Sequence, residues 1–260
     1  MSALAAASRI EATPPDAGDA LAVLRRAALD HAPAVLASSF GAEDMVLIDL
    51  IARNALPVGV FTLDTGRLPD ETHALIDRVR ATYRIDVDVH FPEAAALEPF
   101  VRANGVNAFY ASPSLREQCC AIRKSQPLAR ALGGKCAWIT GLRRAQATSR
   151  RDVAVEEFDA VHGLAKFNPL AEWSRDDVWA YLRAHRVPYN ALHDRGYGSI
   201  GCAPCTRAIQ PGEDERAGRW WWESADHKEC GIHRRPVAWV RTRPDAASQP
   251  VEAGATEIAQ

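Results

Sequence analysis

Apolar and polar positions follow two patterns along this chain, and segments of one pattern alternate with segments of the other. Short apolar runs predict buried strands, whereas apolar residues at every third or fourth position predict helices. The predicted strands span residues 34–40, 57–65, 85–91 and 136–142, and the predicted helices span 19–29, 43–53, 69–83, 93–105, 113–134 and 175–185. Strands that alternate with helices indicate an α/β fold, in which a mostly parallel, twisted sheet carries helices on both faces.

The same pattern divides the chain into three expected parts. Residues 1–18 are rich in Ala, Ser and Pro and show little periodicity, which predicts a flexible leader. Residues 19–222 are expected to form a single α/β domain. Residues 223–260 are expected to be a mobile C-terminal segment, which carries Cys230 and ends in a tail with few aromatic residues. That composition predicts a disordered tail.

Composition narrows the classes of function. The 260 residues are 47% hydrophobic, enough for a sizeable core, and the net charge of −2 lacks the polycationic signature of a nucleic-acid or membrane-surface protein. No apolar run approaches the roughly 20 residues that span a bilayer, and the N-terminus does not read as a signal peptide. We therefore expect a cytoplasmic protein that binds neither nucleic acid nor membrane. In that compartment, clustered cysteines favour metal binding or redox catalysis.

Three turns that follow predicted strands carry hydroxyls, glycines and arginines. Parallel sheets bind ligands outside the carboxyl ends of their strands, so these turns are candidate binding loops. In the first turn, Gly41 lets the backbone approach a phosphate, and Ser38 and Ser39 can donate hydrogen bonds to it. An ordinary glycine turn with a helix cap is an equally good interpretation of that turn alone.

The other two turns carry different side chains. Asp64, Thr65 and Gly66 in the second turn can bind a ribose or simply shape the turn. Arg143 and Arg144 directly follow the strand at 136–142. Because arginine donates two parallel hydrogen bonds to phosphate or sulfate, we favour anion binding here over a solvated pair.

Four of the six cysteines form two pairs that are distant in sequence, Cys119 with Cys120 and Cys202 with Cys205. Neighbours on a helix point about 100° apart, so an adjacent pair reaches two irons of one cluster more easily than it chelates one ion. Structural zinc is the main alternative, and inert thiols are a lesser one. Cys136, in a predicted strand, is expected to be a buried apolar residue.

The remaining cysteine, Cys230, stands alone in the stretch KECGIH. Lys228 and His233 lie near it in sequence, and both can stabilise a thiolate. A reactive nucleophile is therefore one interpretation, and an incidental cysteine is the other.

Several stretches are specific in combination: SSFGAED, FTLDTGRLPDET, CCAIRK, WITGLRRAQ, KFNPLAEWSRDDVWAYL, VPYNALHDRGYGSIGCAPCTR, RAGRWWWE and KECGIH. They resemble the assimilatory adenylyl-sulfate (APS) reductases, thioredoxin-dependent enzymes of the phosphoadenylyl-sulfate reductase family. The resemblance runs from about residue 34 to residue 233. It implies an adenine-nucleotide hydrolase-like fold of the ATP-pyrophosphatase type, with residues 19–222 as the catalytic domain.

The resemblance also implies roles for individual residues. A [4Fe–4S] cluster is expected on Cys119, Cys120, Cys202 and Cys205, and Cys230 is expected to be the catalytic nucleophile. Lys124 is expected between cluster and substrate. The implied substrate-binding set is Ser38, Ser39, Gly41, Asp64, Thr65, Gly66, Lys124, Arg143, Arg144, Arg216, Arg219 and His233.

The implied reaction reduces adenosine 5′-phosphosulfate to sulfite and AMP, in sulfate assimilation toward cysteine. The Cys230 thiolate attacks the sulfur of APS, and an external thioredoxin or glutaredoxin releases sulfite from the resulting S-sulfonate. A reductase of the 3′-phosphorylated substrate, or of both substrates, is the alternative. An ATP pyrophosphatase or sulfurtransferase and a non-enzymatic iron–sulfur or zinc module are more distant ones. A homo-oligomer is also expected.

Overall fold

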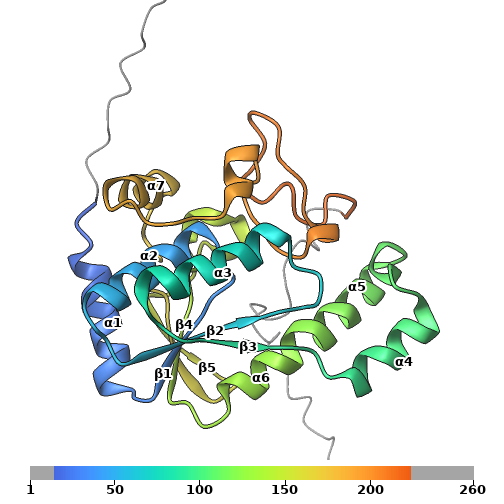
Figure 1. The fold of residues 1–260 in the computed structure, drawn as a ribbon, viewed down its shortest axis with the longest axis horizontal. Coiled ribbons are helices and arrows are strands. Elements are labelled where there is room, and N and C mark those ends of the chain that lie inside the picture. Colours follow the sequence, from blue (N-terminus) through green and yellow to red (C-terminus); the bar gives the residue numbers. More distant parts are fainter. Residues whose placement is uncertain (1–14, 224–260) are drawn as a thin grey trace, which may run out of the picture.

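A six-stranded sheet forms the centre of the computed structural model, which describes residues 15–223 (Figure 1). The strands are β1 Ala34–Ala37, β2 Val58–Leu63, β3 Val87–His90, β4 Ala137–Ile139, β5 Glu156–Asp159 and β6 Leu164–Phe167. Their order across the sheet is β3-β2-β1-β4-β6-β5, and every neighbouring pair is parallel except β5 with β6. The predicted mostly parallel α/β fold is confirmed.

Helices cover both faces of the sheet, as predicted. Successive strand residues point to opposite faces, so Leu36 packs into one hydrophobic cluster and Val35 into another. The first cluster is covered by α1 Gly18–Asp30, α2 Ala42–Arg53, α3 Asp70–Tyr83 and α7 Arg175–Ala184. The second is covered by α6 Gln126–Leu132, through Leu128, Ala131 and Leu132.

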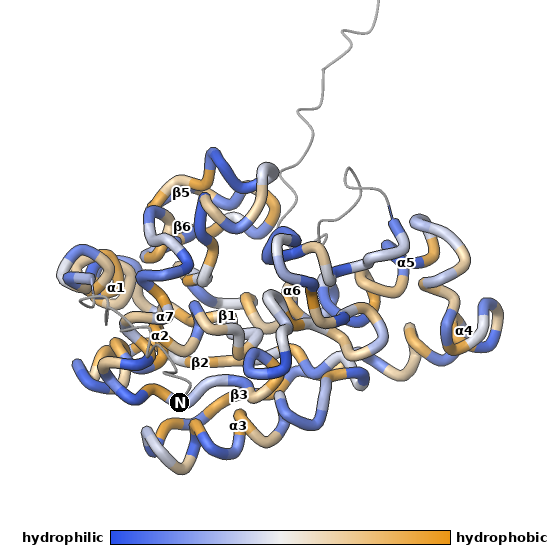
Figure 2. Tube along the Cα trace, turned by 90° about the horizontal axis from the view of Figure 1, so that it is seen from above, coloured by the Kyte–Doolittle hydropathy of each residue, from blue (hydrophilic) through white to orange (hydrophobic). Residues whose placement is uncertain are grey.

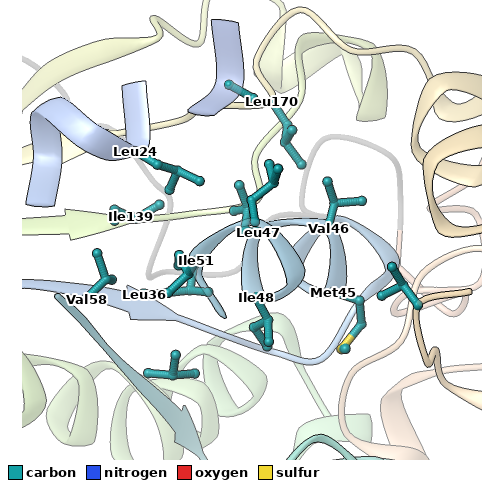
Figure 3. Close-up of a cluster of buried hydrophobic side chains, with 14 of the residues drawn as sticks. Leu24, Leu36, Met45, Val46, Leu47, Ile48, Ile51, Val58, Ile139 and Leu170 are labelled. Carbon is teal, nitrogen blue, oxygen red and sulfur yellow. The ribbon is translucent and has the colours of Figure 1, made fainter. Parts of the chain in front are cut away.

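Helix α2 lies at the centre of the larger cluster. Four consecutive residues, Met45 to Ile48, are fully buried, so this helix is apolar on nearly every side. Figure 3 shows Leu47 and Ile51 of α2 in one group with Leu24 of α1 and Leu36 of β1, and all four belong to the same cluster. Because α2 is buried on nearly all sides, its position against the sheet is well determined. The first turn of α2 lies at the carboxyl end of β1, which ends at Ala37.

A second helical region lies beyond the sheet, on the side away from α1 and α7 (Figures 1 and 2). It contains α4 Ala94–Asn104 and α5 Pro113–Cys120, and α5 continues through the π-helical turn η2 Ala121–Ser125 into α6. The predicted helix over 113–134 is thus confirmed. The π turn was not predicted; such turns are often found at functional sites.

Short 3₁₀ turns make up much of the remaining ordered chain: η1 Ala108–Tyr110, η3 Arg144–Gln146, η4 Thr148–Arg150, η5 Ala191–Arg195 and η6 Ala203–Cys205. The expected leader up to residue 14 and the expected C-terminal segment from residue 224 lie outside the described residues. None of the helices between residues 15 and 223 is long and apolar enough to span a membrane.

Two details differ from the sequence predictions. The β5–β6 hairpin was missed, because β5 is a charged edge strand whose one large apolar side chain, Phe158, is 71% exposed. Its partner β6 buries Lys166, which pairs with Glu157 at 3.0 Å. The prediction for Cys136 was wrong: this cysteine is exposed because it precedes β4 rather than lying inside the strand.

Candidate active site

A pocket lies where the turns after β1, β2 and β4 meet. Its lining includes Ser38, Ser39 and Gly41 from the first turn, Thr65 from the second and Gly141 from the third. The first turn of α2 also lines it, which brings the partial positive charge of a helix N-terminus to the pocket. The parallel sheet therefore gathers the three turns at one place.

The first turn is fixed by side-chain hydrogen bonds. The backbone N–H and the hydroxyl of Ser39 both donate to Oδ2 of Asp44, at 2.6 and 2.9 Å. The N–H of Phe40 donates to Oγ of Ser38 at 3.1 Å. Burial raises the pKa of Asp44 to about 6. Ser38 keeps its own hydroxyl hydrogen for another acceptor.

The three predicted residues of the second turn have two different positions: one lines the pocket and the other two do not. Asp64 accepts a hydrogen bond from the N–H of Gly66 at 2.8 Å and contacts Nε2 of His73 at 2.9 Å. Gly66 has a φ of +68°, which favours glycine. Asp64 and Gly66 thus shape the turn, whereas Thr65 lines the pocket, with Oγ1 3.2 Å from Sγ of Cys202.

The third turn places its two arginines outside the pocket lining. Arg143 is buried, and it donates to Glu43 at 2.8 Å and to Glu215 at 3.0 and 2.9 Å. Arg144 donates to Glu172 at 3.0 Å on the surface. Arg143 therefore holds two carboxylates that do line the pocket. Burial raises the pKa of Glu215.

A glycine makes this packing possible. A Cβ added at Gly141 would lie 2.5 Å from Oδ1 of Asp44 and 2.9 Å from Cβ of Glu43. The start of α2 therefore approaches β4 closely only because residue 141 has no side chain.

Basic residues line another part of the pocket. Lys124, Arg216 and Arg219 all reach it. The Arg219 guanidinium lies 4.7 Å from the ring centre of Trp220 and fills the space that a side chain at Gly201 would need. The structure thus brings the predicted residues Lys124, Arg216 and Arg219 into one pocket with Ser38 and Ser39.

Several lining residues were missed by the sequence analysis. Arg150 lines the pocket, is buried and donates to Gln146 at 2.6 Å. His193 lies in η5, and Gly198 lies in the loop that follows it. Arg150 lies in an arginine-rich stretch with Arg143, so the sequence could have indicated it as an anion-binding candidate. Nothing in the local sequence pattern distinguishes His193 or Gly198.

A second, smaller cavity adjoins the first and is lined by all four paired cysteines. They are free thiols, with Cys119, Cys202 and Cys205 buried and Cys120 half-buried. Phe109 and Trp220 pack against them. Lys124 lines both cavities. Among residues 15–223, no group of three or more His, Cys, Asp and Glu side chains is arranged to hold a single metal ion.

Electrostatics around these cysteines bear on what they can hold. Burial raises the pKa of Cys205 to about 12, and the neighbouring Cys202 and Cys119 add to the effect, whereas Lys124 and Arg219 oppose it. Burial likewise raises the pKa of Cys119, against the influence of Arg123. Arg67, Arg116, Arg123 and Lys124 line the same cavity, and their positive charge favours thiolates against the effect of burial. Four cysteines around one cavity are the donor set of an iron–sulfur cluster. The residues therefore fit such a cluster.

An aromatic and ionic stack joins the cysteine helix to the last described residues. Arg116 of α5 donates to both carboxylate oxygens of Glu223, at 3.0 and 2.9 Å, and both side chains are almost fully buried. The Arg116 guanidinium also lies 4.9 Å from the ring centre of Trp220. The chain thus ends its described part tied to α5. Cys230 and His233 lie outside the described residues.

The chain is similar to proteins of known activity. A family model described as phosphoadenosine phosphosulfate reductase domain matches residues 33–208. Adenosine 5′-phosphosulfate reductase of Allochromatium vinosum is 54% identical over 204 residues, which cover 78% of this chain and 80% of that protein. The enzyme of the same name from Burkholderia cepacia is 51% identical over 218 residues, covering 84% and 87%.

Solved structures agree on the fold. The phosphoadenylyl-sulfate reductase of Candida auris, in complex with phosphate, superimposes with a TM-score of 0.63 at 29% identity, over 74% of this chain and 90% of that one. FMN adenylyltransferase of Candida glabrata superimposes with a TM-score of 0.50 at 13% identity, over 82% and 73%. The second likeness concerns the fold alone.

Proposed function

The chain belongs to the phosphoadenosine phosphosulfate reductase family, and we propose that it reduces adenosine 5′-phosphosulfate to sulfite and AMP in sulfate assimilation. The observation that carries this proposal is the shared wall at Lys124, where a pocket at the strand ends adjoins a cavity lined by four cysteines. Relatives that are about half identical to this chain carry the name of that activity.

Binding of the substrate follows from the pocket lining. The phosphosulfate carries the negative charge, so it lies against Lys124, Arg216 and Arg219. The turn with Ser38 and Ser39 and the N-terminus of α2 bind the phosphate side. Arg143 acts indirectly, because its Nε and Nη2 donate to Glu43 and Glu215 and it lies outside the pocket lining.

Cys230 is the nucleophile in this proposal. Its thiolate attacks the sulfur of the sulfuryl group, an S–S bond forms, and the S–O bond to AMP breaks, so that AMP leaves with the electron pair. A dithiol protein of the thioredoxin or glutaredoxin class then attacks the Cys230 sulfur and releases sulfite. Its second thiol resolves the mixed disulfide and regenerates Cys230.

Positioning contributes more to this step than thiol activation does. A free thiol with a pKa of about 8.5 is about 3% ionised at pH 7, and a pKa of about 6.5 raises that share to about 75%. Nucleophilicity falls about eightfold over the same change, so the net gain is only about threefold. Most of the rate must come from orientation and from neutralising the leaving phosphate, which is the work of Lys124, Arg216 and Arg219.

Cys119, Cys120, Cys202 and Cys205 would hold a [4Fe–4S] cluster, which supplies fixed charge near the substrate and a link between α5 and η6. This chain's own contribution is the placement of Lys124. It lies in η2, the π-helical turn that directly follows Cys120, and it faces both cavities.

A reductase of the 3′-phosphorylated substrate is the second candidate, favoured by the likeness to the Candida auris enzyme. Steady-state assays with thioredoxin as donor distinguish the two, with sulfite and AMP measured as products. We expect turnover of APS that exceeds turnover of the 3′-phosphorylated substrate, activity in Cys136→Ser, and none in Cys230→Ser. Turnover of the 3′-phosphorylated substrate alone would refute the proposal.

A further inference from the structure

The polar groups of the pocket fall into two sets. Lys124 and Arg219 lie near Cys205, where they act on its thiol. Glu43 and Glu215 lie together on Arg143, and the charge of Glu43 also reaches His193. The first set suits the anionic phosphosulfate. Glu43 and Glu215 already accept hydrogen bonds from Arg143. Within residues 15–223, His193 therefore keeps the one acceptor of this set that has no donor, and it suits a part of the ligand that donates a hydrogen bond.

His193 is the least explained member of the second set. Its Nδ1 lies 2.7 Å from the carbonyl oxygen of Tyr197. A carbonyl only accepts, so Nδ1 carries the hydrogen. Burial lowers the pKa of His193, and the charges facing the ring are Glu43, Arg175 and Asp194. The ring is therefore neutral at pH 7, and Nε2 presents a lone pair.

No group in the described part of the chain donates a hydrogen bond to that lone pair. Nε2 of His193 is buried and has no hydrogen-bond partner among residues 15–223, although the residue lines the pocket. The indole of Trp179 lies 5.1 Å away and almost perpendicular, which holds the imidazole in place. A buried acceptor without a donor is unfavourable, and such groups in native structures are usually completed by water or ligand.

We propose that Nε2 of His193 accepts a hydrogen bond from a neutral donor on the nucleoside of the substrate, either a ribose hydroxyl or the amino group of adenine. This inference rests on the proposed function, because the nucleoside is what remains once the basic residues have bound the phosphosulfate. His193 is then a binding residue that fixes the orientation of the nucleoside. Sites built to pair with a ligand OH or NH discriminate strongly against analogues without it.

The substitution His193→Asn tests the role of Nε2 separately from that of Nδ1. The side-chain amide of Asn occupies the place of Nδ1, so it can still donate to the Tyr197 carbonyl, but nothing replaces Nε2. His185→Asn is the matched control, because His185 is exposed and lies outside the pocket lining. Unfolding temperatures of both variants without ligand show whether the fold is intact.

The probe is AMP, a product that does not react, titrated calorimetrically into anaerobic full-length protein. We expect His193→Asn to bind AMP about three- to tenfold more weakly than wild type, which is the range of one neutral hydrogen bond. His185→Asn should bind AMP as wild type does.

Three analogues identify the donor: 2′-deoxy-AMP, 3′-deoxy-AMP and inosine monophosphate, which lacks the amino group. With the analogue that lacks the paired donor, wild type and His193→Asn should bind equally. Unchanged AMP binding by His193→Asn, or the same loss with all three analogues, would overturn the inference. If wild type itself fails to bind AMP, the proposed function fails first, so the two failures are distinguishable.

Discussion

The pocket at the strand ends and the cysteine cavity share Lys124 but are built in different ways. The pocket forms at the ends of β1, β2 and β4, and its polar groups largely hold one another, as Ser39 holds Asp44. The cavity joins α5 and η2 to η6, far apart in sequence, and burial raises the thiol pKa of Cys119 and Cys205. Most polar groups of the pocket are thus paired within the protein, with Nε2 of His193 as an exception, whereas the cavity gathers four cysteines with Arg67, Arg116, Arg123 and Lys124 around them.

The largest expected effect is that of a substitution in the cysteine cavity, which should abolish iron binding and activity but leave the pocket intact. Cys205→Ser removes one thiolate from the cavity, so we expect loss of bound iron, of visible absorbance and of sulfite formation. AMP binding should stay within about twofold of wild type, because the sheet ends hold the pocket. Cys136→Ser is the matched control and should keep its iron, since Cys136 is exposed and lies apart from the cavity. Equal iron in both variants would contradict the assignment of the quartet.

Substitutions of Lys124 test whether the pocket and the cysteine cavity act together, because this residue lines both. Lys124→Ala removes a charge that faces both regions, so we expect kcat/KM for APS to fall roughly 10- to 100-fold, as for loss of a charged hydrogen bond. Lys124→Arg keeps the charge and should lose less. Iron content should stay near that of wild type in both. An unchanged kcat/KM in Lys124→Ala would show that the two regions act independently.

The ion pair of Arg116 with Glu223 tests how the cavity is held to the end of the described chain. Glu223→Ala removes the close counter-charge of the buried Arg116 guanidinium and leaves Glu117, half-exposed and 3.8 Å away, so we expect the free energy of unfolding to fall by about 3–5 kcal/mol. The double variant Arg116→Met with Glu223→Leu should recover much of that loss. Urea unfolding of the anaerobic protein measures both, and a loss below about 1 kcal/mol would refute the role of the pair.

Asp44 gives the smallest expected effect and probes the pocket alone. Burial raises its pKa from 3.8 to about 6, so between those values the folded protein binds a proton that the unfolded chain has lost. Stability from this group is therefore greatest at low pH and falls as the pH rises through about 6, by on the order of 2–3 kcal/mol. Asp44→Asn can still accept from Ser39 and should remove this pH dependence, which urea unfolding at pH 4.5 and pH 7 measures. An equal change with pH in the variant and wild type would assign it to other groups.

The sheet and the strand-end turns were predictable because their signal is local. An apolar run predicts a strand, and parallel strands bring the turns at Ser38 and Thr65 to one edge. The state of Arg143 was not predictable. Its partner Glu215 lies far along the chain, so no local pattern shows that this arginine is buried in an ion triad.

His193 escaped prediction for a related reason. It lies in η5, a short 3₁₀ turn after α7 that packs against Trp179, and only the assembled pocket shows its unpaired nitrogen. The four cysteines were singled out by spacing and resemblance, and the structure adds that they line one cavity. The roles of Cys230 and His233 remain predictions.

The most direct measurement of the central claim is a single exposure of anaerobic protein to APS with labelled sulfur, without any reductant. The account predicts one label per chain on Cys230, located by mass spectrometry, released as sulfite by thioredoxin and absent from Cys230→Ser. Wild-type protein that binds AMP and holds iron, yet acquires no label, would contradict it.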